Sequence, residues 1–96
     1  MPKLYALWSA PNDEAAFTAD YLATHAELCK ALPGIQDVVT GVPLPGSPYA
    51  RVTELVFPTT DALMAALGSA EMGPVMADSG RLQETFANKV DAVIVP

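Results

Sequence analysis

The chain has 96 residues, of which 51% are hydrophobic and 17% charged, and its formal net charge is −6. This apolar content excludes a disordered chain, and the acidic balance disfavours nucleic acid and anionic membrane surfaces as partners. The longest strongly apolar run, residues 92–95, is far shorter than the roughly 20 residues of a membrane-spanning helix. We therefore expect a single domain over residues 1–96.

In chain order, the first half predicts two strands joined by a helix. Asn12 or Asp13 is expected to cap the helix, and Pro33-Gly34 to end it. The segments on either side of the helix are rich in apolar and β-branched residues, which is typical of strands. The predicted elements are a strand over residues 3–9, a helix over residues 13–32 and a strand over residues 35–42.

The second half predicts the same arrangement after a stiff connection over residues 41–48, which holds three prolines and two glycines. Thr59 or Thr60 is expected to cap a helix, and Gly80 to close a shorter helix that follows it. The predicted elements are a strand over residues 50–57, helices over residues 61–67 and 71–79, an irregular return over residues 81–88 and a strand over residues 89–95.

This order predicts a ferredoxin-like βαββαβ fold of the α+β class, with an antiparallel sheet and helices on one face. The predicted strands carry apolar side chains on both faces, whereas a sheet covered on one side should alternate apolar and polar residues. An exposed apolar sheet is normally covered by another molecule. We therefore expect a homodimer in which two sheets pack face to face around a shared barrel-like core.

Two segments resemble the EthD-like family. YLATHAEL at residues 21–28, followed by Leu32-Pro33-Gly34, resembles its Tyr-x-x-x-His-x-x-Leu signature, and RVTELVF at residues 51–57 resembles its Glu-Leu-x-Phe strand. The resemblance implies a dimeric α+β barrel and an association with bacterial ether degradation. It also implies structural kinship with lactone methylisomerases, polyketide cyclases and small oxygenases. The chain departs from this pattern at Glu27, where the family often has proline, and in lacking a tyrosine on the second strand.

His25 and Tyr21 are the predicted catalytic residues. His25 is the only histidine and lies on the apolar stripe of its helix, four residues after Tyr21 and four before Cys29. Its ordinary pKa suits proton transfer at cellular pH, and Tyr21 could donate a hydrogen bond to a carbonyl or enolate oxygen. The alternatives are an inert core histidine and a packing tyrosine. We expect Cys29 to be a buried, inert thiol.

Four further residues are candidates for binding a substrate. Glu54, inside an apolar strand, could orient His25, bind substrate or pair with an arginine, Arg51 or Arg81. Asp78 is a candidate pocket acid or a solvated residue at a helix end. Trp8 and Tyr49 could line an apolar cavity, and Trp8 could equally belong to the dimer core.

The sequence gives little support for a metal or another cofactor, so we expect none. One histidine and one cysteine with scattered carboxylates do not form a recognisable metal site, and no glycine-rich phosphate loop is present for a nucleotide or flavin. Haem bound at His25 is a weaker alternative. The single cysteine and the lack of a signal-peptide pattern predict a cytoplasmic protein.

Two functions are compatible with these residues. In the first, the protein is a dimeric enzyme that binds a small apolar carbonyl or aromatic compound between helix and sheet. It would act as a cofactor-free isomerase, cyclase or oxygenase with His25 as the acid or base. In the second, it is a non-catalytic protein that binds a hydrophobic ligand or assists an enzyme of a degradation or biosynthesis pathway.

Overall fold

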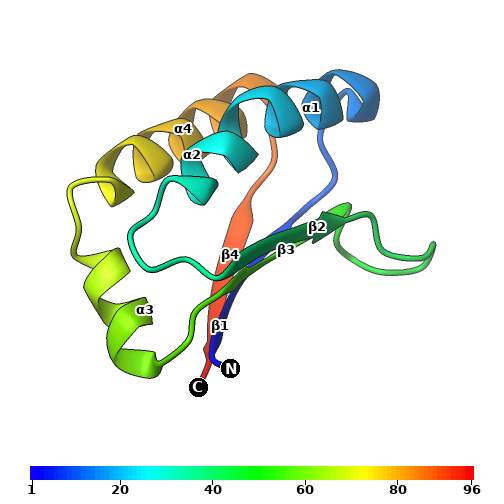
Figure 1. The fold of residues 1–96 in the computed structure, drawn as a ribbon. Coiled ribbons are helices and arrows are strands. Elements are labelled where there is room, and N and C mark those ends of the chain that lie inside the picture. The colour runs from blue at the N-terminus through cyan, green and yellow to red at the C-terminus, as the bar shows by residue number, and fades with distance from the viewer.

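Four antiparallel strands form one sheet in the computed structural model of the protein, which describes residues 1–96 (Figure 1). The strands are β1 (Lys3–Trp8), β2 (Asp37–Gly41), β3 (Arg51–Val56) and β4 (Val90–Val95). Their order across the sheet is β2-β3-β1-β4, and each neighbouring pair is antiparallel. This is the predicted ferredoxin-like arrangement, and it is confirmed.

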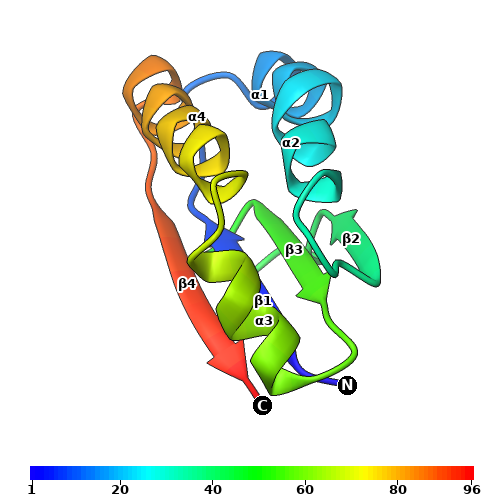
Figure 2. The ribbon, with the colours of Figure 1, turned by 60° about the vertical axis from the view of Figure 1, so that its left-hand side comes forward.

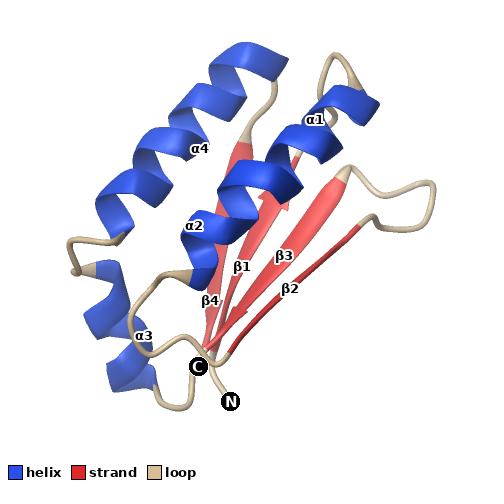
Figure 3. Cartoon of the chain, turned by 45° about the horizontal axis from the view of Figure 1, so that its top comes forward, coloured by secondary structure: helices blue, strands red, loops and turns tan.

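All the helices lie on one face of this sheet (Figures 2 and 3). They are α1 (Glu14–Asp20), the π-helical turn η1 (Tyr21–His25), α2 (Ala26–Lys30), α3 (Thr60–Leu67) and α4 (Met72–Phe86). The predicted caps are confirmed at α1 and α3, where Asp13 accepts a hydrogen bond from the Ala16 N–H and Thr59 accepts one from the Ala62 N–H. No helix is long and apolar enough to cross a membrane.

The prediction for the segment after Gly80 is wrong, because α4 continues through it to Phe86 and leaves no irregular return. Val75, Leu82 and Phe86 are buried, so the apolar stripe of α4 continues past the glycine and packing outweighs its local effect. The helix ends at Ala87 instead, which has a φ of 52° and donates its N–H to the Gln83 carbonyl.

The layer between helices and sheet holds two apolar clusters. One lies around α3 and contains Leu55, Phe57 and Leu63. The other lies at the opposite end, where β1 finishes, and we call it the aromatic cluster; its members are Trp8, Phe17, Tyr21, Ala26, Leu82 and Phe86. The aromatic cluster lies against His25, the predicted catalytic histidine.

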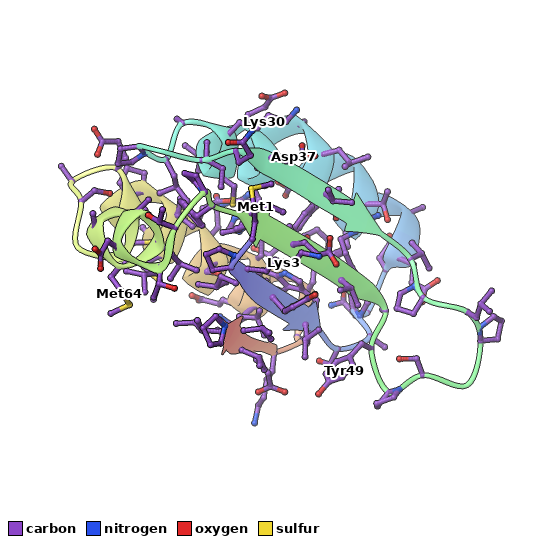
Figure 4. The ribbon with its side chains drawn as sticks, turned by 60° about the horizontal axis from the view of Figure 1, so that its bottom comes forward. Met1, Lys3, Lys30, Asp37, Tyr49 and Met64 are labelled. Carbon is purple, nitrogen blue, oxygen red and sulfur yellow. The ribbon has the colours of Figure 1, made fainter.

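The second face of the sheet carries no helix, and we call it the open face (Figure 4). Its residues alternate with the inward-facing ones, and the cross-strand register brings Tyr5 beside Glu54 and Val93. The apolar members are Tyr5, Leu7, Val39, Val52, Val56, Val93 and Val95. The expected apolar character is therefore only partly correct, because Lys3, Asp37, Glu54 and Asp91 interrupt it.

Candidate functional site

The helix that carries His25 contains a π-helical turn at the candidate site. The Ala26 N–H donates to the Tyr21 carbonyl, five residues back, so the turn from Tyr21 to His25 is one residue wider than an α-helical turn. Tyr21, His25, Ala26 and Cys29 are all buried. The wide turn therefore lets consecutive residues His25 and Ala26 both face the sheet. Such turns occur frequently at functional sites.

His25 is paired with a carboxylate in the protein interior. Its Nδ1 lies 2.9 Å from Asp78 Oδ2, and the two side chains are only 4% and 9% exposed. An ionised carboxylate can only accept hydrogen bonds, so Nδ1 carries the proton and Nε2 keeps its lone pair. His25 is thereby prepared to accept a proton at Nε2.

Arg81 holds this carboxylate from the other side. Its Nε donates to Asp78 Oδ1 at 2.7 Å, and its two terminal nitrogens donate to both oxygens of Asp20 at 2.7 and 2.8 Å. Asp20 lies at the end of α1, whereas Arg81 and Asp78 lie on α4. The chain Asp20–Arg81–Asp78–His25 therefore joins the two helices that cover the aromatic cluster.

These contacts set the protonation states of the pair. Burial would raise the pKa of Asp78, but hydrogen bonds from Arg81 and His25 outweigh it and hold that pKa below 3.8. Burial lowers the pKa of His25 below 6.5, and the hydrogen bond to Asp78 offsets only part of this effect. At neutral pH the pair is therefore a carboxylate and a neutral imidazole.

Aromatic rings enclose the imidazole. The ring centroids of Trp8 and Tyr21 lie 5.5 and 5.0 Å from that of His25. Burial raises the pKa of Tyr21 to about 12, so its hydroxyl keeps its proton at neutral pH. The oxygen lies 2.5 Å from Thr53 Oγ1 on β3. Trp8 Nε1 is buried without a hydrogen-bond partner. A haem at His25 would require space that these packed rings occupy.

A second polar group, which the sequence analysis did not select, lies beside Tyr21. Arg51 is 4% exposed, and its guanidinium carbon lies 5.2 Å from the centre of the Tyr21 ring. It donates to Thr40 Oγ1 at 2.9 Å and to Thr18 Oγ1 at 3.3 Å. Thr40 in turn lies 2.9 Å from Thr53, which completes a network from Arg51 to the Tyr21 hydroxyl.

Two adjoining hollows lie at this end of the sheet. A cavity of about 30 Å³ is lined by Phe17, Thr18 and Arg51 on its inner side. A wider groove of about 320 Å³ is formed mainly by the connection from Val42 to Ala50, which Figure 1 shows projecting beyond the sheet. The two share Glu14, Val42 and Ala50. Neither hollow is lined by His25, which is 3% exposed.

The structure brings together four of the six predicted site residues. His25, Tyr21, Trp8 and Asp78 meet between the helices and the sheet.

The other two lie elsewhere. Glu54 is on the open face, where its carboxylate lies 3.9 Å from Lys3 Nζ, so it pairs with neither arginine and does not orient His25. Tyr49 lines the groove, and its hydroxyl lies 3.5 Å from Asp91.

Cys29 and a metal site, the other two possibilities considered from the sequence, do not form part of the candidate site. Cys29 is buried, which raises its thiol pKa to about 11 and keeps it protonated. Three or more His, Cys, Asp or Glu side chains are nowhere gathered in a way that could hold a metal ion. The candidate site is therefore the His25–Asp78 pair, the Tyr21 hydroxyl and the Arg51 guanidinium.

Comparison with known proteins gives matches to a family model and to solved structures. The EthD domain model matches residues 10–85. The structure of an EthD family protein from Bacillus halodurans C-125 has a TM-score of 0.88 and 24% identity, and covers 100% of this chain and 97% of that one.

Two more distant structures share the fold. An EthD-like protein from Ralstonia eutropha JMP134 is 14% identical, with a TM-score of 0.75 over 98% of this chain and 88% of that one. SnoaB, a cofactor-independent oxygenase from Streptomyces nogalater, is 13% identical, with a TM-score of 0.68 over 99% and 90%. No curated protein matches the sequence.

Proposed function

Because this chain belongs to the EthD family, we propose that it binds a small, largely apolar carbonyl or aromatic compound and that His25 moves a proton on it. The observation that carries the proposal is the 2.9 Å contact between His25 Nδ1 and Asp78, buried among aromatic rings. A carboxylate that fixes the tautomer of a neutral imidazole is the arrangement that a general base requires.

The neighbouring groups supply the rest of a proton-transfer site. His25 Nε2 removes a proton from carbon or oxygen of the substrate, and the protonated Tyr21 hydroxyl donates a hydrogen bond to the oxygen on which negative charge develops. The structural neighbour SnoaB, a cofactor-independent oxygenase, supports a reaction of this kind. The proposed reaction class is therefore cofactor-free isomerisation, cyclisation or oxygenation.

A route to the imidazole begins at the cavity of about 30 Å³. Phe17 forms part of its wall, and the Phe17 and Tyr21 rings are 5.6 Å apart. Because His25 is 3% exposed, the substrate reaches it only after one of these two rings has rotated. We propose this rotation as the opening step.

The test of this proposal begins with native mass spectrometry, in which a co-purified compound gives the substrate class. With that compound, we expect the rate to rise with pH through a pKa below 6.5 and to be constant around neutral pH, because neutral His25 is the active form. His25→Gln is expected to lower kcat by roughly 10²- to 10⁴-fold. Full turnover in this variant would remove His25 from the mechanism.

One observation favours a second function, a non-catalytic ligand-binding or accessory protein. His25 is buried and neither hollow reaches it, whereas the groove beside Tyr49 is open to solvent. In that case the ligand affinity would stay constant between about pH 5 and 8, and no bound compound would be converted.

We further propose that the protein is a homodimer formed by sheet-to-sheet packing of the open faces. Val39, Val93 and Val95 are 46%, 45% and 47% exposed there, next to half-buried Tyr5 and Leu7. Lys3, Asp37 and Asp91 would form the rim of the interface, whereas Glu54, which lies beside Tyr5 and Val39 on a central strand, would be covered while paired with Lys3.

Val93→Glu is expected to weaken dimerisation by about a hundredfold, because it places a carboxylate from each protomer in the apolar part of the interface. Sedimentation velocity at a series of concentrations measures this change. Met64→Glu is the matched control, since Met64 is 55% exposed on α3 and lies outside the proposed interface. A wild-type protein that sediments as a monomer at micromolar concentration would refute the proposal.

A further inference from the structure

Arg51 is a buried cation without an acidic partner. Its side chain lies on the helix-facing side of β3, paired across the strands with Trp8, and only 4% of it is exposed. The ion pairs of the protein involve Lys3, Lys30, His25 and Arg81, and no carboxylate lies within 4.0 Å of Arg51. Buried arginines are normally paired with an anion, because a lone buried charge is costly.

The groups around Arg51 are polar but neutral. Two hydroxyls, of Thr40 and Thr18, accept its hydrogen bonds, and the Tyr21 ring lies against its guanidinium. Arginine is always charged in proteins and presents five donors in a planar fork. The two hydroxyls do not occupy all five donors of the Arg51 guanidinium. No acidic side chain of the folded protein neutralises its positive charge.

The small cavity is lined by Arg51 and by Thr18, which accepts a hydrogen bond from the Arg51 guanidinium. It measures about 30 Å³, which is room for about two water-sized groups, or for the two oxygens of one carboxylate. The adjoining groove of about 320 Å³ falls at the lower end of the range for small-ligand sites and is lined by Leu44, three prolines and Tyr49. The inner cavity is thus suited to a charged end and the groove to an apolar body.

We propose that the cavity beside Arg51 binds the carboxylate of a small organic acid whose apolar part lies in the groove beneath residues 42–50. The guanidinium fork and a planar carboxylate match in a bidentate pair. Arg51 faces away from the open face, so a second copy packed there would not supply the anion. The proposal adds a charged end to the ligand of the second proposed function, which binds in the groove, and in that respect rests on it; binding requires no turnover.

A monocarboxylate fits the local charges better than a phosphate group. Glu14 lines both hollows, and the chain carries a net charge of −6. One arginine can neutralise one negative charge, whereas a dianion would leave a charge exposed to Glu14. The same reasoning makes Glu14 the residue that limits affinity, since it is exposed at the rim.

The test is an NMR titration of the intact protein with benzoate, with benzamide as the neutral isostere and with inorganic phosphate. Benzoate is expected to shift the amide signals of Glu14, Thr18 and Ala50 saturably and to bind at least tenfold more tightly than benzamide. Arg51→Met is expected to weaken benzoate binding by roughly tenfold or more, and Arg51→Lys by an intermediate factor, because the charge remains but the fork is lost.

Two further variants make the result decisive even if Arg51→Met folds poorly. Glu14→Gln is expected to tighten benzoate binding about threefold by removing a like charge. Lys30→Met removes an exposed cation from α2, away from both hollows and the open face, and is expected to leave the affinity unchanged.

Equal binding of benzoate and benzamide, tighter binding of phosphate, or no saturable shift with benzoate would overturn the proposal. Benzoate binding together with full turnover of the co-purified compound by His25→Gln would instead contradict only the proposed catalytic function. Conversion of a neutral substrate by His25 without benzoate binding would contradict only the carboxylate site.

Discussion

Replacing Asp78 with asparagine is expected to lower the free energy of unfolding by about 2 to 4 kcal/mol. The substitution preserves the size of the side chain but removes the charge that Arg81 and His25 both contact, at 2.7 and 2.9 Å. It also leaves only one acceptor oxygen, which Arg81 requires, so the new NH2 group faces Nδ1 and favours the other tautomer of the imidazole. Urea unfolding measures the first effect, and ¹⁵N chemical shifts of the imidazole measure the second.

The pH dependence of stability follows from the same pair. The folded-state pKa of His25 is lowered, so the unfolded chain binds more protons below about pH 6.5 and the stability from this group is lost as the pH falls. The pKa of Asp78 is also lowered, so its contribution is present above about pH 3.9 and is lost as the pH falls through the folded-state pKa. Both groups therefore make the wild-type protein less stable in acid.

Asp78→Asn should abolish the part of this acid dependence that Asp78 contributes and enlarge the part that comes from His25, because Asp78 raises the pKa of His25 against the effect of burial. Glu84→Gln is the control, because Glu84 is exposed on the same helix as Asp78 and forms no side-chain hydrogen bond or ion pair. It should change the free energy of unfolding by less than about 0.5 kcal/mol. If both variants behaved alike, the buried pair would contribute nothing to stability.

Trp8→Ala is expected to lower the free energy of unfolding by about 3 to 5 kcal/mol, a large part of the total stability of a domain of this size. Trp8 is 0% exposed, and its ring centroid lies 5.6 Å from both Phe17 and Tyr21. Its removal leaves a void at the centre of the aromatic cluster, because the rings of Phe17, Tyr21 and His25 all pack against Trp8. Thermal and urea denaturation measure the loss.

Trp8→Phe separates packing from hydrogen bonding. Because Nε1 has no partner, this variant gives up ring volume but no hydrogen bond, and it should cost about 1 to 2 kcal/mol. A cost as large as that of Trp8→Ala would contradict this expectation.

Most of the fold could be predicted from local patterns. The strand segments are rich in apolar and β-branched residues, Asp13 and Thr59 cap helices as expected, and Gly34 has the positive φ of 74° that favours glycine after a helix. The end of α4 could not be predicted in this way. Gly80 is a local signal, whereas the burial of Leu82 and Phe86 depends on residues from the other end of the chain.

The candidate site was predicted only where it lies on one helix. Tyr21 and His25 were found from their spacing, but the partners of the site are distant in sequence: Asp78 lies 53 residues from His25, and Arg81 lies 61 residues from Asp20.

On β3, the sequence drew attention to Glu54 as a polar residue in an apolar strand. The register shows that Arg51 and Thr53 face the helices, whereas Glu54 faces away from them. The signal that could have found Arg51 is its alternation with Thr53 and Leu55, which are buried.

The π-helical turn from Tyr21 to His25 has a consequence for how chains of this architecture can differ in length. Successive residues of an α-helix are offset by about 100°, so an uninterrupted helix would need one residue fewer to keep Phe17 and Cys29 aimed at the sheet. Those two residues belong to different apolar clusters, one on each side of the turn. A relative that lost this single extra residue would either rotate one of its two helical halves out of the core or give up the adjacent burial of His25 and Ala26.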